Sequence, residues 1–474
     1  MTRRVLLVNV VGLTQPLLRQ MPNLAALAAQ GAMRQLAPVF PAVTCSVQSS
    51  MVTGLMPNQH GIVGNGWYFR DLGEVLLWRQ SNKLVAGEKV WETAAGRFDG
   101  YTSANVGWWY AMNASNDVIV TPRPVYHQDG RKSPDCYVVP SDLHDILTDK
   151  LGVFPLFQYW GPTADITSSR WLVDASLEIL QRYSPTLLTA YIPHLDYDFQ
   201  RYGPRSPQAI TAAADVDAAL APLLAAAAEH DMTTIVVSEY GIAPAERPVD
   251  INRQLRREGY LNVYTQQGRE YLDPWTSRAF AVADHQAAHV YVRDPSDIAR
   301  VAGLVAALDG VDQVMDRNAQ QRSAIDHPRA GELVAVAEPG AWFTYYYWLD
   351  DARAPEFAPC VDIHRKPGYD PAELLMNPDD RTVKAKAAAA LAKKALGLRY
   401  TMGVIALNGR HVGGTHGRLP DGDEDTPLII TSSPDLLPDQ AAPLPVTAVR
   451  DVVLKAHGRR ARSGRAAGPS ANPR

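Results

Sequence analysis

The amino-acid sequence predicts an α/β fold with a mostly parallel central sheet, helices on both of its faces, and insertions that form a smaller cap subdomain. Residues 5–11 are a continuous apolar run of strand length, which is typical of a strand covered on both faces. Helical and strand patterns then alternate along the chain, which favours a parallel sheet. The length of 474 residues allows two or three domains, or one large core with insertions.

The expected elements follow one another in the order strand, helix, strand. A proline near the start and a glycine just past the end predict a helix between Pro22 and Gly31. The next strand is expected near residues 35–39. Further along, helices are expected over residues 169–183, 207–230 and 381–397, and strands over residues 186–191, 233–238 and 428–431.

The pattern divides the chain into a core, a smaller subdomain and a tail. Residues 1–244 and 391–455 are expected to form the core, with an aromatic-rich, weakly periodic insertion over residues 70–165 at one end of the sheet. Residues 245–390 are expected to form the smaller subdomain. Residues 456–474 are rich in Arg, Gly, Ala and Pro without an apolar pattern, which predicts a disordered tail.

Composition excludes some partners and favours a cytoplasmic protein. The net charge of −4 gives no overall field that would attract a nucleic-acid polymer or an anionic membrane. Three widely spaced cysteines, Cys45, Cys136 and Cys360, form neither a disulfide framework nor a metal-binding pattern, which fits a reducing compartment. The N-terminal apolar run is short and lacks a cleavage site, and no membrane span is expected.

Thr44 is the first residue whose position suggests chemistry. It lies between the turn-forming Pro41 and a helix expected over residues 45–53, at the N-cap position. The free N–H groups and the dipole of a helix N-terminus favour a bound phosphate. A hydroxyl there can attack phosphorus when a metal ion lowers its pKa. A threonine that only caps the helix explains the same pattern, so this feature alone leaves both interpretations open.

The residues around Thr44 resemble a known nucleophile segment. Pro-x-x-Thr ends at Thr44, residues 53–63 read Thr-Gly-Leu-x-Pro-x-x-His-Gly-Ile-Val, and Asn65 follows. This pattern resembles the nucleotide pyrophosphatase/phosphodiesterases of the alkaline-phosphatase superfamily, and it implies the fold of that superfamily. The resemblance implies that Thr44 is the nucleophile and a metal ligand, that Asn65 binds a phosphoryl oxygen, and that His60 is a structural residue of the loop.

Two later blocks resemble the ligands of one metal ion in that family. Asp196, followed by Tyr-Gly-Pro at residues 202–204, resembles a block in which an Asp and a His four residues on bind metal. Gln200 stands where that His is expected. His416, in Gly-Thr-His-Gly, resembles the last metal-binding His of the family. The resemblance therefore implies Asp196 and His416 as ligands.

The second metal position departs further from the family pattern. Residues 235–242 resemble a strand that ends in Ser-Asp-His-Gly, but Glu239 stands for the Asp and Tyr240 for the His. At the end of the first strand, Val11 replaces a metal-binding Asp. Thr44 and Glu239 are therefore the ligands implied here, and one or two divalent ions are expected. Zinc, manganese and magnesium are not distinguished.

These departures leave three interpretations open: other residues replace the lost ligands, one ion remains, or no ion binds. In a strand, residues i and i+2 face one way, so Asp196 is expected to share a face with His194 or Asp198. Asp362 and His364 would pair likewise, although they also fit a solvated loop. An oxygen-rich set of this kind suits magnesium, calcium or manganese better than zinc. The possible additional ligands are His194, Asp198, Gln200, His285, Asp362 and His364.

The resemblance implies a metal-dependent hydrolase that cleaves a small phosphorylated substrate through a covalent phospho-threonine. Phosphodiesters, pyrophosphates, phosphomonoesters and phosphonates are all compatible, and phosphonoacetate hydrolase shares the same plan. The alternative is a non-catalytic protein that binds phosphate ligands or acts as a scaffold. A sulfatase is excluded, because the residues after Cys45 lack the Pro and Arg of Cys-x-Pro-x-Arg. The aromatic runs at residues 67–69 and 108–110 are expected either to stack on a substrate base or to pack the insertion.

Overall fold

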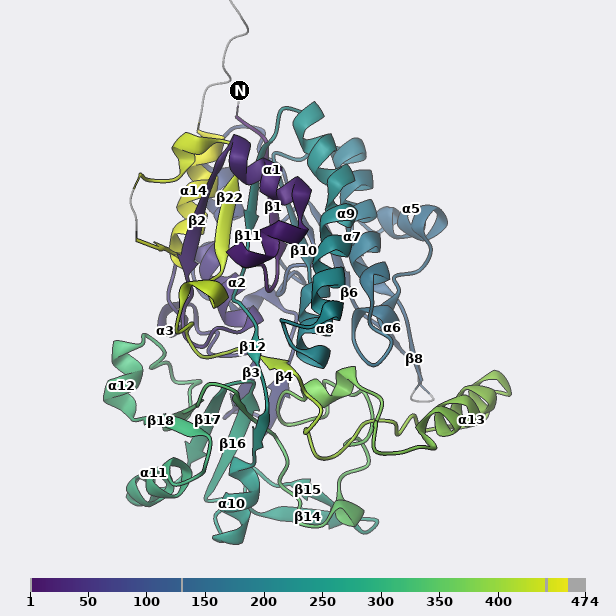
Figure 1. Ribbon diagram of the computed structural model, residues 1–474, viewed down its shortest axis with the longest axis vertical. Coiled ribbons are helices and arrows are strands. Elements are labelled where there is room, and N and C mark those ends of the chain that lie inside the picture. Colours follow the sequence, from purple (N-terminus) through teal and green to yellow (C-terminus); the bar gives the residue numbers. More distant parts are fainter. Residues whose placement is uncertain (1, 129–130, 440–441, 459–474) are drawn as a thin grey trace, which may run out of the picture.

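A nine-stranded sheet forms the larger of two lobes in the computed structural model, which describes residues 2–128, 131–439 and 442–458 (Figure 1). The strand order is β23-β2-β22-β11-β1-β10-β5-β6-β9. The strands are β1 (Val5–Val10), β2 (Ala32–Ala37), β5 (Ser103–Val106), β6 (Val118–Pro122), β9 (Cys136–Val139), β10 (Leu187–Ile192), β11 (Thr233–Val237), β22 (Leu428–Thr431) and β23 (Leu444–Pro445).

Strand β1 lies at the centre of this sheet. It pairs in parallel with β10 on one side and β11 on the other, and β5 and β6 continue the parallel arrangement beyond β10. Strand β22 is antiparallel to β11 and β2, and β9 is antiparallel to β6. All residues of β1, β10, β11 and β22 are buried, which explains why these strands are mostly apolar in sequence and do not alternate with polar residues. The predicted α/β class is confirmed.

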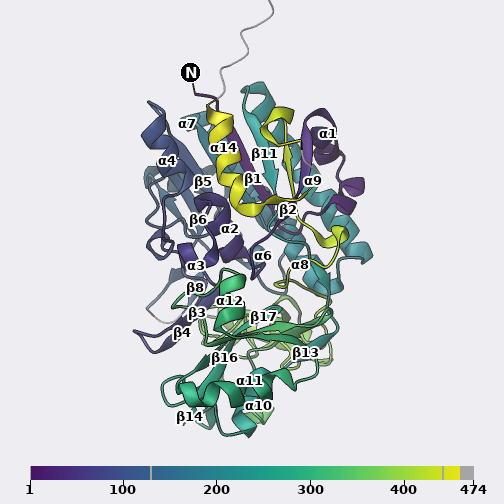
Figure 2. The same cartoon turned by 90° about the vertical axis from the view of Figure 1, so that its left-hand side faces the viewer.

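Helices cover both faces of the sheet (Figures 1 and 2). One layer contains α1 (Pro22–Gln30), α7 (Ile166–Tyr183), α8 (His194–Tyr202) and α9 (Pro207–Glu229), and the other contains α2 (Thr44–Thr53), α4 (Val90–Arg97) and α14 (Val449–His457). The predicted helix over residues 207–230 and the strand over residues 428–431 lie where they were expected. The predicted disordered tail, residues 456–474, lies outside the described residues from residue 459 onward.

Helix α9 corrects one expectation. By length and composition alone it is long and apolar enough to cross a membrane, with 44% of its most apolar window buried. No membrane span was expected from the sequence, but within the described residues this one helix has the length and composition of one. The buried face of α9 packs against α7 and α8, and Asp217 on that face accepts hydrogen bonds from the Asn23 and Leu24 backbone N–H groups at 3.0 Å.

The smaller lobe is built on an antiparallel sheet of order β16-β17-β19-β18 with its own apolar cluster. Its elements are β16 (Ala279–Asp284), β17 (Ala287–Val292), β18 (Val311–Met315), β19 (Leu333–Ala337), α10 (Ile251–Arg257), α11 (Ile298–Ala306) and α12 (Arg317–Arg322). A two-residue turn, His285-Gln286, joins β16 to β17. The backbone N–H of Gln286 donates to the carbonyl of His416 at 2.9 Å, so this turn contacts a segment of the predicted site.

The predicted insertion over residues 70–165 is wrong in part, because β5, β6 and β9 belong to the central sheet. These strands are only four or five residues long. Such short strands show no periodicity that could be detected within an aromatic-rich segment. The same region also contains β4 (Glu74–Leu77), which pairs with β3 (Gly66–Phe69), and the helices α5 (Asp142–Leu151) and α6 (Leu156–Tyr159).

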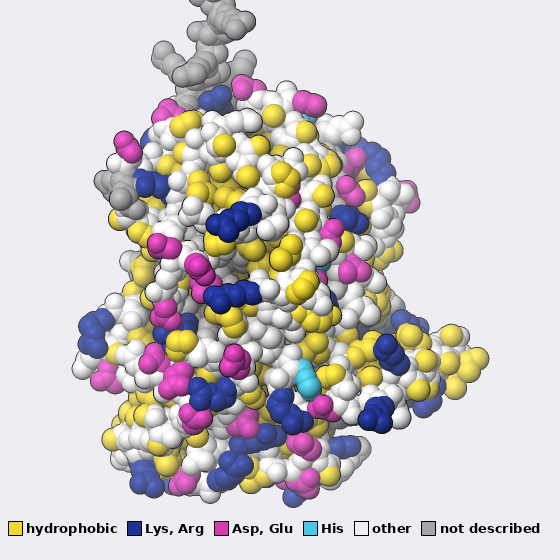
Figure 3. All heavy atoms as spheres, in the orientation of Figure 1, with side chains coloured by type: hydrophobic (Ala, Val, Ile, Leu, Met, Phe, Trp, Pro, Cys, Tyr) yellow, Lys and Arg dark blue, Asp and Glu magenta, His cyan; other side chains and the backbone are white. Residues whose placement is uncertain are grey.

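The remaining short elements connect the lobes and edges. Helix α13 (Val383–Ala395) projects from the body, and Figure 3 shows hydrophobic and basic side chains on this arm. The other strands pair two by two: β7 (Val125–Tyr126) with β8 (Lys132–Ser133), β12 (Ala243–Pro244) with β21 (Gly414–Thr415), β13 (Arg247–Val249) with β20 (Ala341–Phe343), and β14 (Val263–Gln266) with β15 (Arg269–Leu272). Helix α3 spans Pro57–His60.

Candidate active site

The predicted site residues meet at the carboxyl ends of the central parallel strands. Asp196 lies in α8, which follows β10, and Glu239 and Tyr240 follow β11 directly. Thr44 begins α2, and His416 follows β21. In open α/β sheets, ligands bind outside the carboxyl ends of the strands, so this is the edge at which a site is expected.

Thr44 is the first residue of α2 and not its N-cap as predicted. The N-cap is Val43, whose side chain makes no capping bond. The Thr44 hydroxyl lies 2.8 Å from the Tyr240 hydroxyl, so it contacts the site instead of its own helix. Every residue of α2 is buried, and Thr44 is 3% exposed. The chain therefore directs this hydroxyl into a closed, polar interior.

Asn65 is held beside Thr44 by the helix start and by the smaller lobe. Its Oδ1 accepts from the Cys45 backbone N–H at 3.0 Å, and its Nδ2 donates to Asp284 Oδ1 at 3.0 Å. The backbone N–H of Asn65 donates to Asp284 Oδ2 at 2.7 Å. Burial raises the pKa of Asp284 to about 7, against the effect of these two bonds. One N–H of the Asn65 amide stays available for a ligand.

Glu239 is fixed by two neutral donors. Asn9 Nδ2 donates to its Oε1 at 2.5 Å and Gln48 Nε2 donates to the same oxygen at 2.6 Å, whereas Oε2 has no partner. Burial raises the pKa of Glu239 to about 8, and the bonds from Gln48, Asn9 and Thr44 oppose that rise. Asn9 and Gln48 were not predicted. The available signals were a polar residue inside a buried strand, and a glutamine one helical turn after Thr44.

His416 and Asp196 face each other with unsatisfied atoms. His416 Nδ1 lies 2.8 Å from the Ala42 carbonyl, which only accepts, so Nδ1 carries the proton and Nε2 has a free lone pair. His416 Nε2 lies 3.8 Å from Asp196 Oδ1, and neither atom has a hydrogen-bond partner. Burial lowers the pKa of His416 to about 3 and raises that of Asp196 to about 7.

Four aromatic rings form a continuous stack through the site. Tyr240 stacks on His416 with ring centroids 3.7 Å apart, His416 lies 3.6 Å from His285, and His285 lies 3.6 Å from Tyr369. The Tyr369 hydroxyl then donates to Gln200 Oε1 at 2.8 Å. His285 reaches this position from the β16–β17 turn, where its φ of 59° places it in the left-handed region. The structure thus brings His285, a possible ligand, beside His416.

The residues present fit one of the two metal positions that the resemblance implies. Asp196 Oδ1 and His416 Nε2 are buried acceptors that face each other without a partner, as a cation between them requires. At the other position Val11 offers no ligand atom, Tyr240 contacts Thr44 Oγ1, and Asn9 and Gln48 bind Glu239 Oε1, so Glu239 Oε2 is the one acceptor of these side chains left without a partner. A second ion does not fit these residues.

A geometric group of three ligands occurs elsewhere. Within the described residues, one set of three His, Cys, Asp or Glu side chains has ligand atoms all within 4.8 Å of one another: Asp135, Cys136 and His144. It lies at β9 and α5, on the outer edge of the sheet. Asp196, Glu239 and His416 do not form such a compact trio.

Two possible ligands beside Asp196 point elsewhere. The segment was predicted to be a strand, in which residues i and i+2 share a face. It is instead the helix α8, in which they do not. Asp198 pairs with Arg201 at 2.9 Å, and the His194 ring lies against Tyr197. Gln200, four residues after Asp196, is the neighbour on the same helix face.

The predicted pair Asp362 and His364 is not in contact with the Asp196–His416 pair. Asp362 binds Lys132 at 3.1 Å and Arg365 at 2.5 Å. The pKa of His364 is lowered by burial and by Lys132, which keeps the imidazole neutral. This loop therefore forms a separate polar cluster.

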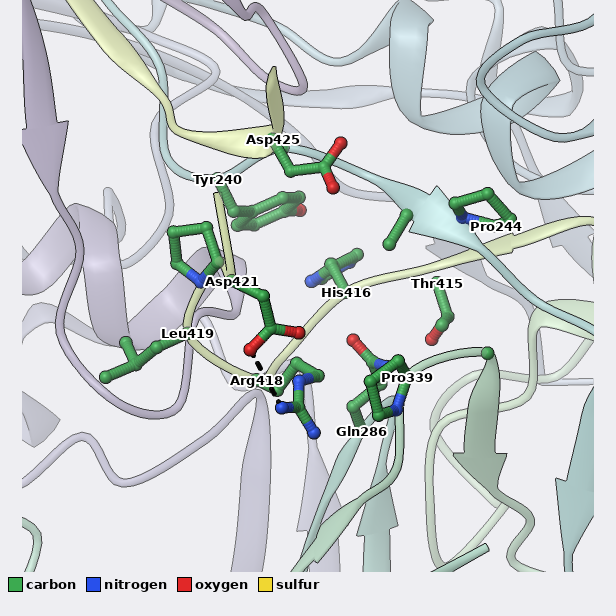
Figure 4. Close-up of a pocket in the computed structure, with 14 residues that line it drawn as sticks. Tyr240, Pro244, Gln286, Pro339, Thr415, His416, Arg418, Leu419, Asp421 and Asp425 are labelled. Carbon is green, nitrogen blue, oxygen red and sulfur yellow. Dashed lines mark hydrogen bonds and ion pairs between the residues drawn. The ribbon is translucent and has the colours of Figure 1, made fainter. Parts of the chain in front are cut away.

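The aromatic runs mostly pack the fold. Trp67, Trp108 and Tyr110 are buried in apolar clusters, whereas Trp109 is partly exposed and lies 4.8 Å from Trp78. Separately, Figure 4 shows a pocket of about 250 Å³ whose wall includes the stacked Tyr240 and His416 rings.

Two of the residues that line that pocket, Arg418 and Asp421, form an ion pair at 3.0 Å (Figure 4). Thr44 does not line the pocket, but Tyr240, which does, contacts the Thr44 hydroxyl.

A curated relative, an uncharacterized pyrophosphatase/phosphodiesterase of Schizosaccharomyces pombe, is 27% identical over 234 residues. That match spans 47% of this chain and 41% of the relative, so less than half of the relative's length is matched.

Two solved structures share the fold at low identity. Phosphonoacetate hydrolase of Sinorhizobium meliloti, in complex with phosphonoformate, superimposes with a TM-score of 0.60, 17% identity and 96% coverage of both chains. Murine ectonucleotide pyrophosphatase/phosphodiesterase 5, an inactive form in complex with AMP, gives a TM-score of 0.57, 16% identity and coverage of 98% of this chain and 97% of that chain. These matches confirm the predicted alkaline-phosphatase-like fold.

The family of the chain is shown by its match to a protein-family model. The model for type I phosphodiesterase/nucleotide pyrophosphatase matches residues 5–370, which is most of the chain and includes Thr44, Asn65, Asp196 and Glu239. The chain therefore belongs to the type I phosphodiesterase/nucleotide pyrophosphatase family of hydrolases, within the alkaline-phosphatase superfamily.

Proposed function

We propose that this chain hydrolyses small phosphoryl or phosphonyl substrates, with Thr44 as the nucleophile. The observation that carries the proposal is the placement of the Thr44 hydroxyl at the N-terminus of a wholly buried ten-residue helix, 2.8 Å from Tyr240 and close enough to Glu239 to oppose the rise in the pKa of that carboxyl. A helix N-terminus favours an anion, and a hydroxyl beside a carboxyl group can be activated for attack.

The roles of the neighbouring side chains follow from their contacts. As Thr44 Oγ1 forms a bond to phosphorus, its proton passes to Glu239 Oε2, the oxygen without a partner, and the bond from phosphorus to the leaving group breaks. The Tyr240 hydroxyl donates to Oγ1, and the free N–H of Asn65 with the helix N-terminus holds the phosphoryl oxygens. Water then cleaves the phospho-threonine.

One divalent ion fits beside this arrangement. Asp196 and His416 would hold it, and it would supply positive charge next to the transferred group. Family membership supports metal dependence, and the donor set of one carboxylate and one imidazole is compatible with zinc or manganese.

The substrate class is proposed from charge and from the relatives. The structural neighbours carry AMP or phosphonoformate, which are both small anions with a phosphoryl or phosphonyl group. The net charge of −4 does not draw in a long anionic polymer. We therefore propose small phosphodiesters, pyrophosphates, phosphomonoesters or phosphonates as substrates.

A second function is favoured by a specific observation. Thr44 is 3% exposed and does not line the nearby pocket, whose wall includes Tyr240, the residue in contact with the Thr44 hydroxyl. A protein that binds a phosphate ligand without turnover would tolerate such a closed threonine. Phosphate binding without turnover is therefore the alternative function, and the experiment below distinguishes it from hydrolysis.

The experiment measures turnover and the covalent intermediate together. Purified chain is assayed with magnesium, manganese or zinc on an aryl phosphodiester, an aryl phosphomonoester, a nucleotide and phosphonoacetate. Thr44→Ala should lower kcat by at least about 10³-fold, and Thr44→Ser should retain part of it. Acid-quenched wild type should show the mass of one added phosphoryl group, which Thr44→Ala lacks. Equal rates for wild type and Thr44→Ala, or phosphate binding without any turnover, would support the alternative function.

A further inference from the structure

We infer that this chain binds one divalent ion, at Asp196 and His416, and that Tyr240, Asn9 and Gln48 close the second metal position. The inference rests on the proposed function for the placement of the site. Its test counts bound ions and needs no substrate, so it can fail or succeed independently of hydrolysis.

The open position is marked by unsatisfied acceptors. Asp196 Oδ1 and His416 Nε2 lie 3.8 Å apart, are buried, and have no hydrogen-bond partner. Two ligand atoms at about 2.1 Å from one tetrahedral ion lie ~3.4 Å apart, so a small movement completes the coordination. The Ala42 carbonyl accepts from His416 Nδ1 and fixes the tautomer that leaves Nε2 free.

Gln200 can complete this position without losing its other contact. It lies one helical turn after Asp196 on α8, and its amide is joined to the Tyr369 hydroxyl at 2.8 Å. The Tyr369 hydroxyl can either donate or accept, so a half-turn of the amide keeps that bond. The turn directs the carbonyl oxygen, in place of the unpartnered Nε2, toward Asp196. The ion then has two oxygen ligands and one nitrogen ligand.

The closed position is filled by neutral groups. Glu239 Oε1 is already satisfied by Asn9 and Gln48, at 2.5 and 2.6 Å, and Thr44 Oγ1 by Tyr240 at 2.8 Å. Glu239 Oε2 is the one oxygen of these two side chains that stays without a partner, and a single free oxygen does not make an ion site.

Two further features keep that position closed. Tyr240 cannot swing aside freely, because its ring is stacked at 10° on His416 and is 2% exposed. Val11, which is fully buried and stands where the family pattern has a metal-binding Asp, offers no ligand atom.

The experiment counts ions per chain. The full chain carries His144→Ala throughout, which removes the separate Asp135, Cys136 and His144 group from the count. Chelator-stripped protein is dialysed against zinc or manganese, and bound metal is measured by mass spectrometry against protein concentration. We expect about one ion per chain, retained in Glu239→Gln and in Thr44→Ala, and lost in Asp196→Asn and in His416→Ala.

The outcomes separate the alternatives. Two ions per chain, or one ion that is lost in Glu239→Gln and kept in Asp196→Asn, would overturn the inference, and so would a folded wild-type chain that binds none. Near-ultraviolet circular dichroism of each stripped variant verifies that lost binding is not lost folding. Thr44→Ala distinguishes the two proposals, because it should keep the ion while turnover disappears.

Discussion

The Tyr240 hydroxyl lies 2.8 Å from Thr44 Oγ1, at the end of a ring that stacks on His416 with centroids 3.7 Å apart. One side chain therefore links the proposed nucleophile to the proposed ion site. Its hydroxyl and its ring serve different contacts, so a substitution that removes only the hydroxyl tests the first contact and leaves the second in place.

Tyr240→Phe should lower kcat by about 10²-fold, because the hydroxyl that donates to Oγ1 during phosphorus transfer is lost. The ring and its stacking on His416 are retained, so the number of bound ions should not change. Steady-state kinetics with metal analysis measures both. Tyr197→Phe is the matched control, since that buried hydroxyl has no partner and its loss should leave kcat unchanged. A wild-type kcat in Tyr240→Phe would show that the hydroxyl does not act on Thr44.

The stability of the ion-free chain should fall as the pH rises from about 4 to about 7, in part through Asp284. Burial raises the pKa of this carboxyl from 3.8 to about 7, so in this window the folded chain keeps a proton that the unfolded chain has lost. The contribution is fully present below the unfolded pKa and is lost through the folded pKa, with a slope of up to about 1.4 kcal/mol per pH unit.

Chemical denaturation with chelator present, near pH 5 and near pH 7, measures this slope. Asp284→Asn should be less stable overall, because its amide faces the Asn65 N–H groups, but its loss of stability with pH should be smaller. Asp71→Asn, an exposed carboxyl, should leave the slope as in wild type. An unchanged slope in Asp284→Asn would contradict the assignment.

Local patterns located the sheet and the carboxyl ends of its strands. The runs that became β1, β10 and β11 are apolar on both faces because helices cover both, and Asp196 and Glu239 follow two of them. Periodicity failed at Asp196 itself, where α8 begins only two residues earlier and the segment was interpreted as a strand. A helix of nine residues after a strand offers too few turns for a clear period.

The hydrogen bonds that hold the site residues in place could not be predicted from local patterns. Asn9 reaches Glu239 across 230 residues of sequence, and Asp284 reaches Asn65 across 219. Neither Asn9 nor Asp284 lies in a chemical motif, and their roles become visible only when distant segments are placed side by side. The predicted ligand Glu239 was recognised from its motif, but its two neutral donors required the fold.

Lys366→Met should lower the free energy of unfolding by about 3–5 kcal/mol, because it leaves two buried carboxyl groups without their cation. Lys366 is 1% exposed and lies 2.7 Å from both Asp370 and Glu373. Chemical denaturation measures the loss. Lys386→Met is the control, since this lysine is 60% exposed in its pair with Asp380, and exposed pairs contribute only about 0–1 kcal/mol. Equal losses in the two variants would show that burial of the Lys366 cluster does not matter.

Gln200→His should tighten zinc binding by about 10- to 100-fold, because it places an imidazole on the helix face that already carries Asp196. Asp196 and residue 200 are one helical turn apart on α8, and His416 Nε2 lies 3.8 Å from Asp196 Oδ1. Competition with a chromophoric chelator measures the affinity, and the stoichiometry should stay at one ion. Asp198→His is the matched control, because residue 198 lies on a different face and pairs with Arg201. Equal affinities for Gln200→His and wild type would place the ion away from this helix face and leave His416 without a partner ligand on α8.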